Sequence, residues 1–357
     1  MYIKEVYLKN FRNYREQTIE LNENANVFYG LNAQGKTNIL EALYFSALGR
    51  SFRTFKENEL IKFNHDYSNI IITYIKNDRE NKIEINLNKG NKKIIKINGV
   101  KINKSSEIVG NINLVIFSPD DITILKQGPA LRRKFLDVLI SQLKPKYLFE
   151  LLEYNKILDN RNACLKARNI DTLDIWNEQL ASKMEIIYKY RKEYIDKLQN
   201  KLITIHPELT NNQEEIKIIY KTNFTNKEEF IELLKRNEQN DLFKGFTNEG
   251  AHREDFEILI NDKSLSMYGS QGQHRTAILS LKIAELNIIK EEIGENPILL
   301  LDDVTSELDE QRVMSIFDVV KDYQVLITCT DLAQILKYDC LTKNIKMFNI
   351  NSGHIES

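Results

Sequence analysis

The sequence is poor in the residues that hold small secreted domains together or bind zinc. It has three cysteines, Cys164, Cys329 and Cys340, which are widely spaced and form no C-x-x-C pair. This spacing supports neither a disulfide framework nor a zinc site. We therefore expect the cysteines to be buried small residues.

Long apolar segments and an excess of either charge are also absent. No window approaches the roughly 18 apolar residues of a membrane span, and the N-terminal MYIKEVYLKNF lacks the apolar core of a signal peptide. We therefore expect a cytoplasmic protein with no membrane contact. The 50 Lys and Arg residues nearly balance 51 Asp and Glu residues, so any DNA contact must come from a local basic patch.

The stretch VFYGLNAQGKTNILEAL, residues 27–43, carries the clearest functional pattern. The spacing G-x-x-x-x-G-K-T is made by Gly30, Gly35, Lys36 and Thr37, between a short apolar strand and a helical pattern. Glycines here let backbone N–H groups surround a phosphate, and the helix directs its positive end at the anion. Lys36 would reach the terminal phosphates and Thr37 would offer a hydroxyl to Mg²⁺. The stretch therefore predicts a nucleotide-binding loop; the alternative is a glycine-rich turn without a ligand.

A second part of the nucleotide chemistry is predicted near the C-terminus. Residues 297–303, PILLLDD, are typical of a buried parallel strand that ends in two carboxylates. Asp302 would hold hydrated Mg²⁺, and Asp303 would orient or deprotonate the attacking water. Paired carboxylates at a strand end are commonly only exposed, but together with the phosphate loop they predict an ATPase.

Residues 70–103 predict an antiparallel meander. Short β-branched runs, IIITYI, KIEINL and KIIKI, are separated by the tight-turn pairs Asn-Asp, Lys-Gly and Asn-Gly. The last part carries six lysines with no carboxylate between them: Lys89, Lys92, Lys93, Lys96, Lys101 and Lys104. This basic row could follow a phosphate backbone or be a solvated sheet face, and both alternatives stay open.

The middle of the chain predicts a mainly helical insert. Gly128 and Pro129 open a helix that carries Arg132 and Arg133, and two long helices follow over residues 147–168 and 172–205. In the second, every seventh residue is apolar: Leu173, Leu180, Ile187 and Tyr194. We expect an antiparallel hairpin that ends at Pro207 and has Trp176 in its seam.

A strand within EEIKIIYKT and a helix over residues 228–240 complete the insert. With 357 residues, the chain is long enough for two domains. We therefore divide it into a head, residues 1–125 and 245–357, and a helical arm, residues 126–244.

Residues 270–273, Ser-Gln-Gly-Gln, precede a helix predicted over residues 276–292, and such a helix start can bind a second anion. The segment resembles the signature motif S-G-G-Q of ABC-type ATPases, which contacts the γ-phosphate held by the other subunit. Residues 306–309, Ser-Glu-Leu-Asp, resemble the D-loop of the same superfamily. This resemblance implies two chains that sandwich two ATP molecules. The intermediate length of the helical insert argues against a transporter subunit.

The complete set of motifs resembles one family, RecF. LKNFRNY, GLNAQGKTN, FSPDD with GPALRRKFLD, GAHRED, SQGQHRT and LLLDDVTSELD occur in this order from Leu8 to Asp309. The resemblance implies an α/β fold, a P-loop ABC-type ATPase head with a mixed sheet and an antiparallel β meander, plus a mainly helical arm. The candidate nucleotide-binding residues are Gly30, Asn32, Gly35, Lys36, Thr37, Asn38, Ser270, Gln271, Gly272 and Gln273, with Thr37 and Asp302 at the metal. LKNFRNY with the GLNAQGKTN loop also resembles the opening of the Rad50 and SMC group, which implies that Arg12 and Asn13 lie near the nucleotide.

The sequence departs from the family pattern at few positions. GAHRED, residues 250–255, lacks the usual proline after its glycine and the usual final Asp-Asp, and His274 replaces a common glutamine. His252 and Arg253 could face nucleotide or DNA, or be structural. Residues 118–121 and 330–331 stand where the superfamily has its glutamine and histidine loops, but contain neither residue.

The resemblance also implies a function in DNA repair, replication and recombination, including the SOS response. ATP with Mg²⁺ would close a homodimer on double-stranded DNA at single-strand/double-strand junctions of gaps, where RecO-type and RecR-type mediators help load the recombinase. Weak, DNA-stimulated hydrolysis to ADP and phosphate would then release the clamp. The candidate DNA-binding residues are Lys92, Lys93, Lys96, Arg132 and Arg133. The alternatives are a nucleotide-switched structural clamp with negligible turnover and an ABC transporter motor subunit.

Overall fold

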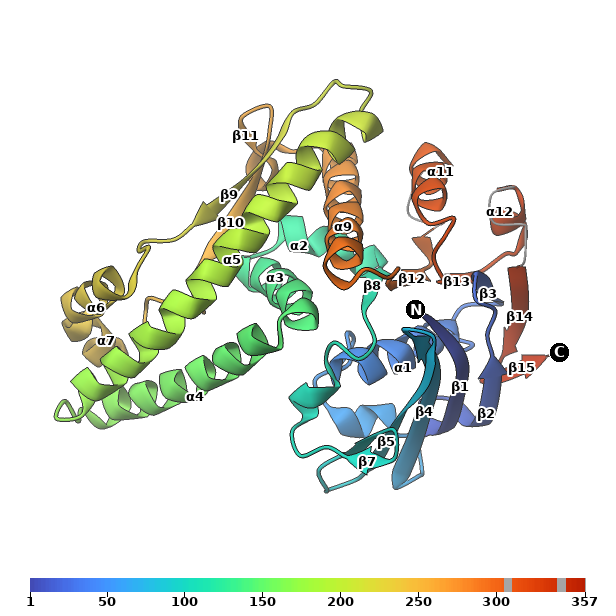
Figure 1. Ribbon diagram of the computed structural model, residues 1–357, viewed down its shortest axis with the longest axis horizontal. Coiled ribbons are helices and arrows are strands. Elements are labelled where there is room, and N and C mark those ends of the chain that lie inside the picture. The colour runs from blue at the N-terminus through green and yellow to red at the C-terminus, as the bar shows by residue number, and fades with distance from the viewer. Residues whose placement is uncertain (305–309, 339–344, 357) are drawn as a thin grey trace. The chain divides into compact units, whose positions relative to one another are not determined.

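The computed structural model describes residues 1–304, 310–338 and 345–356, and the chain forms two compact units (Figure 1). Unit 1 comprises residues 1–121 and 285–357, and unit 2 comprises residues 122–284. Residues 245–284, which we assigned to the head, therefore pack with the helical insert. The functional division into head and arm stays a prediction.

The first sheet of unit 1 is antiparallel, with the strand order β2-β1-β4-β5-β6-β7. Its strands are β1 (Tyr2–Phe11), β2 (Tyr14–Glu20), β4 (Tyr67–Lys76), β5 (Arg79–Asn88), β6 (Ile94–Ile97) and β7 (Val100–Lys101). Alternate residues are buried, as Ile83, Ile85 and Leu87 are in β5, because successive side chains of a strand point to opposite faces. The predicted meander is confirmed.

The second sheet of unit 1 has the order β15-β14-β3-β13-β12-β8 and is parallel from β14 to β8. Its strands are β3 (Ala25–Tyr29), β8 (Leu114–Phe117), β12 (Ile298–Asp302), β13 (Val325–Cys329), β14 (Ile345–Asn351) and β15 (His354–Glu356). Every residue of β8, β12 and β13 is buried, as expected for a parallel sheet covered on both faces. The parallel strand predicted within residues 297–303 is thus confirmed.

Register brings the carboxyl ends of three strands to one edge of this sheet. Tyr29 of β3 pairs with Cys329 of β13, and Thr328 pairs with Asp302 of β12. α1 (Lys36–Leu48) follows β3 and is almost entirely buried. The remaining helices described in unit 1 are short: η1 (Glu57–Leu60), η2 (Ser105–Ile108), η3 (Pro119–Asp121), α11 (Glu310–Val319) and α12 (Ala333–Leu336).

The two sheets of unit 1 are joined by the side chain of Gln324. Its Oε1 accepts a hydrogen bond of 2.7 Å from the Ile3 backbone N–H, and its Nε2 donates one of 2.7 Å to the Ile3 carbonyl. Gln324 precedes β13 of the parallel sheet, whereas Ile3 lies in β1 of the antiparallel sheet. One side-chain amide therefore satisfies both the N–H and the carbonyl of Ile3.

Unit 2 is mainly helical. Its helices are α2 (Ile122–Lys126), α3 (Pro129–Leu143), α4 (Pro145–Ala167), α5 (Leu173–Leu209), α6 (Lys227–Arg236), α7 (Glu238–Lys244), α8 (Leu265–Tyr268) and α9 (Gln271–Ile293), which ends in unit 1. A small antiparallel sheet contains β9 (Ile216–Lys221), β10 (Asp255–Ile260) and β11 (Lys263–Ser264). α4 and α5 lie side by side as the predicted hairpin (Figure 1). The apolar residues predicted at every seventh position of α5 are all buried.

The hairpin differs from the prediction in three details. α5 includes Pro207 and continues two residues beyond it, although proline has no N–H to donate to the carbonyl four residues earlier. Trp176 is only half-buried, and the helix interface beside it contains Asn177, whose Oδ1 accepts a hydrogen bond of 2.7 Å from the buried Arg161 of α4. The single helix predicted over residues 228–240 is two helices, because Asn237 interrupts it and its side chain bonds the Leu233 carbonyl.

The remaining expectations about composition concern cysteines and membrane helices. Cys329 is buried and Cys164 is half-buried, and both are free thiols; Cys340 lies outside the described residues. Among the described helices, none combines the length and the apolar character needed to cross a membrane.

Candidate nucleotide-binding site

The loop between β3 and α1 adopts backbone conformations that only glycine reaches without strain. Gly30 has φ +145° and Gly35 has φ +118°. A Cβ atom on Gly30 would lie 2.4 Å from the Ile350 carbonyl oxygen, and one on Gly35 would lie 2.5 Å from Asn13 Nδ2. Both glycines are therefore favoured by backbone conformation, and Gly30 is also required by space because the close atom is a backbone oxygen, as the phosphate-loop interpretation demands.

Lys36 folds back over this loop. Its Nζ donates hydrogen bonds of 2.5 Å to the Gly30 carbonyl and 3.0 Å to the Leu31 carbonyl. Burial lowers the pKa of the Lys36 ammonium, and the nearby carboxylates of Asp303 and Asp302 act in the opposite direction. A desolvated cation held at the mouth of a glycine loop is a suitable partner for a phosphate anion.

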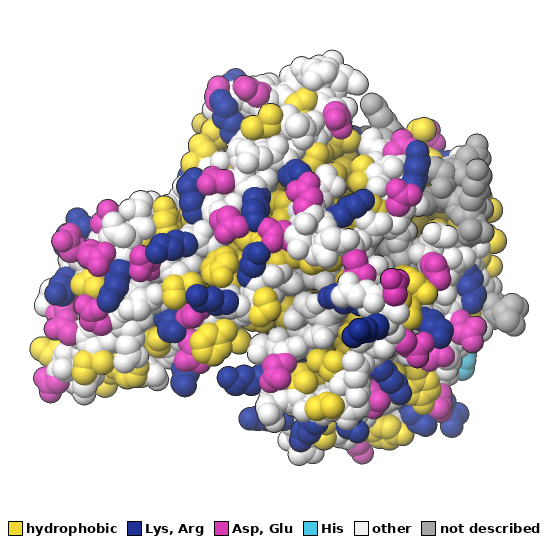
Figure 2. Space-filling view, in the orientation of Figure 1, with side chains coloured by type: hydrophobic (Ala, Val, Ile, Leu, Met, Phe, Trp, Pro, Cys, Tyr) yellow, Lys and Arg dark blue, Asp and Glu magenta, His cyan; other side chains and the backbone are white. Residues whose placement is uncertain are grey.

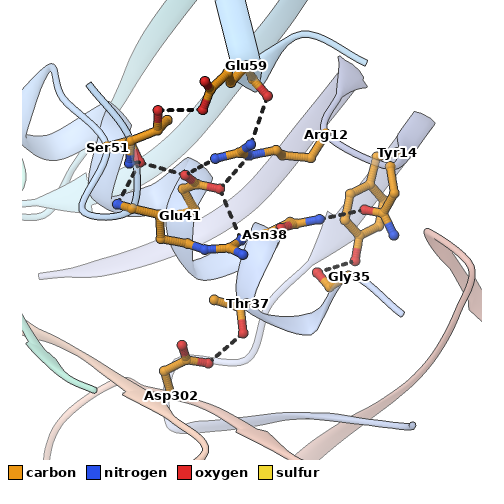
Figure 3. A network of polar contacts seen from close by, with 12 residues as sticks. Arg12, Tyr14, Gly35, Thr37, Asn38, Glu41, Ser51, Glu59 and Asp302 are labelled. Carbon is orange, nitrogen blue, oxygen red and sulfur yellow. Dashed lines mark hydrogen bonds and ion pairs between the residues drawn. The ribbon is translucent and has the colours of Figure 1, made fainter. Parts of the chain in front are cut away.

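Thr37 and Asp302 meet at the edge of the parallel sheet (Figure 3). Thr37 Oγ1 donates a hydrogen bond of 2.8 Å to Asp302 Oδ1, and Thr328 Oγ1 donates one of 2.7 Å to the same oxygen. Burial raises the pKa of the Asp302 carboxyl, while both hydroxyl donors lower it in part. The structure thus joins two residues that the sequence assigned to one metal ion.

These oxygens fit Mg²⁺ chemically. A hydroxyl and a carboxylate are hard oxygen ligands, and Mg²⁺ is commonly bound through one or two protein oxygens plus water and substrate phosphates. Within residues 1–304, 310–338 and 345–356, no group of three or more His, Cys, Asp or Glu side chains could hold a metal by itself. A magnesium ion here would therefore depend on phosphate oxygens for much of its coordination.

Asp303 follows Asp302 in a strained conformation. Its φ is +49°, in the left-handed region, and its backbone N–H donates to Thr328 Oγ1 at 3.0 Å. A non-glycine residue in this region costs roughly 1–2 kcal/mol, although Asp and Asn tolerate it best. Such strain concentrates at functional sites, and here it lies directly after the carboxylate of Asp302.

Arg12 contacts α1 through a buried carboxylate (Figure 3). Its Nε and Nη2 donate hydrogen bonds of 2.8 and 2.7 Å to the two oxygens of Glu41, and Nη1 donates one of 2.8 Å to the Glu59 carbonyl. Glu41 also accepts a bond of 2.5 Å from the Ser51 hydroxyl. The guanidinium that the family resemblance placed near the nucleotide thus makes three bonds to protein oxygens.

Sequence reasoning missed Glu41 and Thr328. Glu41 is the one charged residue of the mainly apolar segment ILEALYFSAL, and a lone acid on a buried helix needs a cationic partner. Thr328 ends an apolar run next to Cys329 but carries no motif. The sequence therefore contained a signal for Glu41, whereas the position of Thr328 at the site depends on the order of the strands in the sheet.

Asn13 holds the phosphate loop from outside. Its Nδ2 donates a hydrogen bond of 2.7 Å to the Gln34 carbonyl, and its Oδ1 accepts one of 2.8 Å from Asn38 Nδ2. The Tyr14 hydroxyl donates 3.1 Å to the Gly35 carbonyl. Asn13 and Asn38 therefore lie at the predicted site, whereas Asn32 is exposed on the loop.

The signature segment lies in unit 2 at the start of α9. Ser270, Gln271 and Gly272 are exposed, and Gln273 is half-buried. The Ser270 N–H donates 2.9 Å to Gln273 Oε1, and the Gln273 N–H donates 3.2 Å to Ser270 Oγ. This reciprocal pair is a capping box.

The GAHRED residues have internal partners in unit 2. His252 Nδ1 lies 2.9 Å from the Tyr154 hydroxyl and its Nε2 lies 2.9 Å from the Thr247 carbonyl. Burial lowers the pKa of His252 to about 4. These contacts support the structural alternative for His252, while Arg253 is exposed and lies over the Phe246 ring.

The candidate DNA-binding residues fall into two groups. Lys92 is exposed and Lys96 is partly exposed. Lys93, in contrast, binds the Glu57 carboxylate and donates 2.7 Å to the Gly49 carbonyl. On the face that Figure 2 shows, Lys and Arg alternate with Asp and Glu instead of forming one basic surface.

The two arginines of α3 are also engaged inside unit 2. Arg132 forms a two-point ion pair with Asp255, with hydrogen bonds of 2.7 and 2.8 Å, and Arg133 donates 2.7 Å to the Glu254 carbonyl. Their guanidinium groups therefore fasten α3 to the GAHRED segment.

The other predicted loops are described only in part. The Ser118 N–H donates 2.8 Å to Asp121 Oδ2, and Asp331 Oδ1 accepts 2.9 Å from the Ala333 N–H. Both carboxylates cap local turns, and neither contact reveals a role for residues 118–121 or 330–331. The predicted D-loop, residues 306–309, lies outside the described residues.

Comparisons with known proteins cover nearly the whole chain. Residues 2–355 match the family model described as RecF/RecN/SMC N terminal domain. Proteins named DNA replication and repair protein RecF are 44% identical in Clostridium beijerinckii, over 99% of this chain and 98% of that protein, and 46% identical in Clostridium botulinum, over 100% of both.

Solved structures agree with these relatives. One of the recombination mediator protein RecF with ATP, in the RecFOR pathway, superposes with a TM-score of 0.91 and 40% identity, over 99% of this chain and 97% of that one. An SMC head bound to the C-winged helix domain of ScpA has a TM-score of 0.59 at 17% identity, over 100% and 96% of the two chains. The predicted α/β fold of an ABC-type ATPase is confirmed.

Proposed function

The chain belongs to the RecF family, and we propose that it is a cytoplasmic, DNA-binding ABC-type ATPase of DNA replication and repair. ATP closes a homodimer on double-stranded DNA at single-strand/double-strand junctions of gaps. There it acts with RecR-type and RecO-type mediators to load the strand-exchange recombinase, and hydrolysis releases the clamp. The observation that carries the ATPase assignment is the contact of Thr37 with Asp302 beside the glycine loop.

The residues around that contact have different roles in hydrolysis. Mg²⁺, when bound, offsets negative charge on the phosphates. Thr37 and Asp302 would hold it, and Lys36 exchanges its loop carbonyls for phosphate oxygens. Asp303 orients the attacking water and takes its proton, since it directly follows the buried acid and faces the same site as Lys36.

The dimer supplies what one chain lacks. Ser270 and Gly272 are exposed at the start of α9, so a second copy can present them to the γ-phosphate. These contacts form only in the closed state, and ATP therefore shifts the population towards the closed dimer.

DNA contacts come from the basic row of the antiparallel sheet. Lys92 and Lys96 are accessible to a phosphate backbone, while Lys93, Arg132 and Arg133 are engaged within the protein. We therefore assign the first two to DNA and the last three to folding.

The test is ATP turnover per chain over a range of protein concentrations, with and without gapped duplex DNA at fixed salt. Salt is fixed because phosphate contacts weaken steeply as it rises. A rate per chain that increases with concentration, and again with DNA, is expected for a shared site. A rate per chain that changes neither with protein concentration nor with DNA would contradict the clamp and favour a single-chain ATPase or a transporter motor subunit. Concentration-dependent closure without turnover would identify a nucleotide-switched structural clamp.

A further inference from the structure

The side-chain amide of Gln273 is held at both ends. Its Oε1 accepts the Ser270 N–H at 2.9 Å, and its Nε2 donates 3.0 Å to Glu214 Oε1. Glu214 lies between α5 and β9, far in sequence from the signature segment, residues 270–273. The cap at the start of α9 therefore has a partner outside α9.

Glu214 fixes which way this amide faces. A carboxylate only accepts hydrogen bonds, so it faces the NH₂ group of Gln273 and leaves Oε1 for the Ser270 N–H. If the amide rotated by 180°, its oxygen would face the carboxylate and its NH₂ group would face an N–H. Without Glu214, this constraint is lost and Gln273 can leave the cap.

Glu214 is itself anchored by a buried histidine. Its Oε2 lies 3.2 Å from Nε2 of His206, in the last turn of α5. His206 is fully buried, and its Nδ1 lies 2.9 Å from the hydroxyl of Ser280 in α9. The Glu214 carboxylate is thus held between His206 at the end of α5 and Gln273 at the start of α9.

We propose that Glu214 is a positioning residue for the signature segment. By orienting Gln273, it keeps the capping box intact, and the Ser270 hydroxyl, which accepts from the Gln273 N–H, is held where its O–H can donate to a second copy's γ-phosphate. This inference rests on the proposed function, because only the ATP-closed dimer uses the signature segment. Glu214 acts through Gln273 and touches no nucleotide.

The experiment uses the full chain and two readouts. Self-association is measured by sedimentation with Mg²⁺ and ATPγS, and nucleotide affinity of the monomer is measured with a fluorescent ATP analogue at low protein concentration. The variants are Glu214→Ala, Glu214→Gln and, as a matched control, the exposed neighbour Glu215→Ala. Ser270→Arg is the reference for a dimer that cannot close.

We expect Glu214→Ala to weaken self-association by about tenfold, the effect of losing one charge-assisted hydrogen bond. Glu214→Gln should stay within about threefold of the wild type, because its Oε1 still accepts from Gln273 Nε2. Glu215→Ala should match the wild type. Nucleotide affinity of the monomer should stay within about twofold in all variants, because Glu214 lies in unit 2 and the phosphate loop lies in unit 1. Urea unfolding followed by the fluorescence of Trp176 in α5 checks that unit 2 stays folded.

Two results would overturn the positioning role. One is a Glu214→Ala protein that self-associates as tightly as Glu215→Ala. The other is a Glu214→Gln protein whose self-association is weakened as much as that of Glu214→Ala. If Glu214→Ala does not fold, Glu214→Asp replaces it, because its carboxylate is one methylene shorter, and unchanged association would again overturn the role. If the wild-type protein does not self-associate in the presence of ATPγS, the proposed dimer itself is refuted. This result needs no variant, so it can be distinguished from failure of the positioning role.

Discussion

The hydroxyl of Thr37 donates a 2.8 Å hydrogen bond to the Asp302 carboxylate, although the two residues are 265 positions apart in the chain. Strand order explains the meeting, because only β13 lies between β3, which leads into the loop of Thr37, and β12, which ends in Asp302. β13 contributes Thr328 to the same carboxylate oxygen. The candidate site is therefore assembled by the parallel sheet.

Replacing Lys36 by alanine should weaken ATP binding by roughly 100-fold, because a charge-assisted contact to phosphate contributes about 3 kcal/mol. Folding should be unaffected, since burial already disfavours the charged ammonium. Fluorescent-nucleotide titration measures the affinity, and urea unfolding checks the fold. The exposed Lys56→Ala variant is the control. Equal affinities in the two variants would contradict the role of Lys36.

Replacing Asp303 by asparagine should leave ATP binding intact and slow hydrolysis by at least about 100-fold, the usual effect of losing a general base. Asparagine tolerates the left-handed conformation of residue 303, so the backbone should not change. The dimer should then persist with ATP. Single-turnover hydrolysis and sedimentation measure both effects, and normal turnover would show that another group activates the water.

Alanine at Gly30 should destabilise the protein by at least roughly 3 kcal/mol, because left-handed strain adds to a clash with the Ile350 carbonyl. The control is Gly90→Ala, since Gly90 also has a left-handed φ, +74°, but open space around it. The control should lose only about 1 kcal/mol. Urea unfolding without nucleotide compares the two, and equal losses would argue against the tight approach of β14 to the loop.

His252 should make unit 2 less stable in mild acid. Its pKa is lowered to about 4, mainly by burial, whereas an unfolded histidine titrates near 6.5. The unfolded chain therefore binds a proton first, so this contribution is present above about pH 6.5 and is lost as the pH falls towards 4. Between these limits, the free energy of unfolding should fall by up to about 1.4 kcal/mol for each pH unit.

The measurement for His252 uses the single tryptophan, Trp176, which lies in α5 and reports on unit 2. Urea unfolding is followed by its fluorescence between pH 7 and 4.5 for the wild type and His252→Gln. The variant should show the shallower dependence on pH. Identical slopes would mean that His252 does not titrate in this range.

Replacing Lys92 and Lys96 together by alanine should weaken DNA binding and reduce the slope of log affinity against log salt by about 2, because each phosphate contact contributes about 0.9. Lys93→Ala should leave the slope unchanged, since its ammonium is bound to Glu57 and the Gly49 carbonyl. Binding of gapped duplex at several salt concentrations tests this difference. A larger effect from Lys93 would reverse the assignment.

Local patterns predicted much of the fold and of the site. The phosphate loop is contiguous in sequence, and the all-apolar strand before Asp302 indicates a parallel sheet, so both could be recognised without coordinates. The meander was predicted from short β-branched runs and tight-turn pairs. In each case, the residues that determine the structure are neighbours in the chain.

Interactions between distant segments could not be predicted in this way. Arg132 and Arg133 looked like a basic patch, but they bind Asp255 and the Glu254 carbonyl because α3 packs against β10. The partly buried contact of Glu214 with His206 corresponds to no sequence motif. A sequence shows which residues carry charge, but the tertiary fold decides which of them are neutralised.

The position of β3 between β13 and β14 has a consequence for biosynthesis. Both neighbours are translated about 300 residues after β3, so the phosphate loop gains its supporting sheet only when those later segments have been made. Residues 122–284 form a continuous unit that can fold while translation proceeds. The nascent chain would therefore expose an unpaired, mainly apolar β3 until β13 and β14 have been translated, and this segment is a natural target for chaperones.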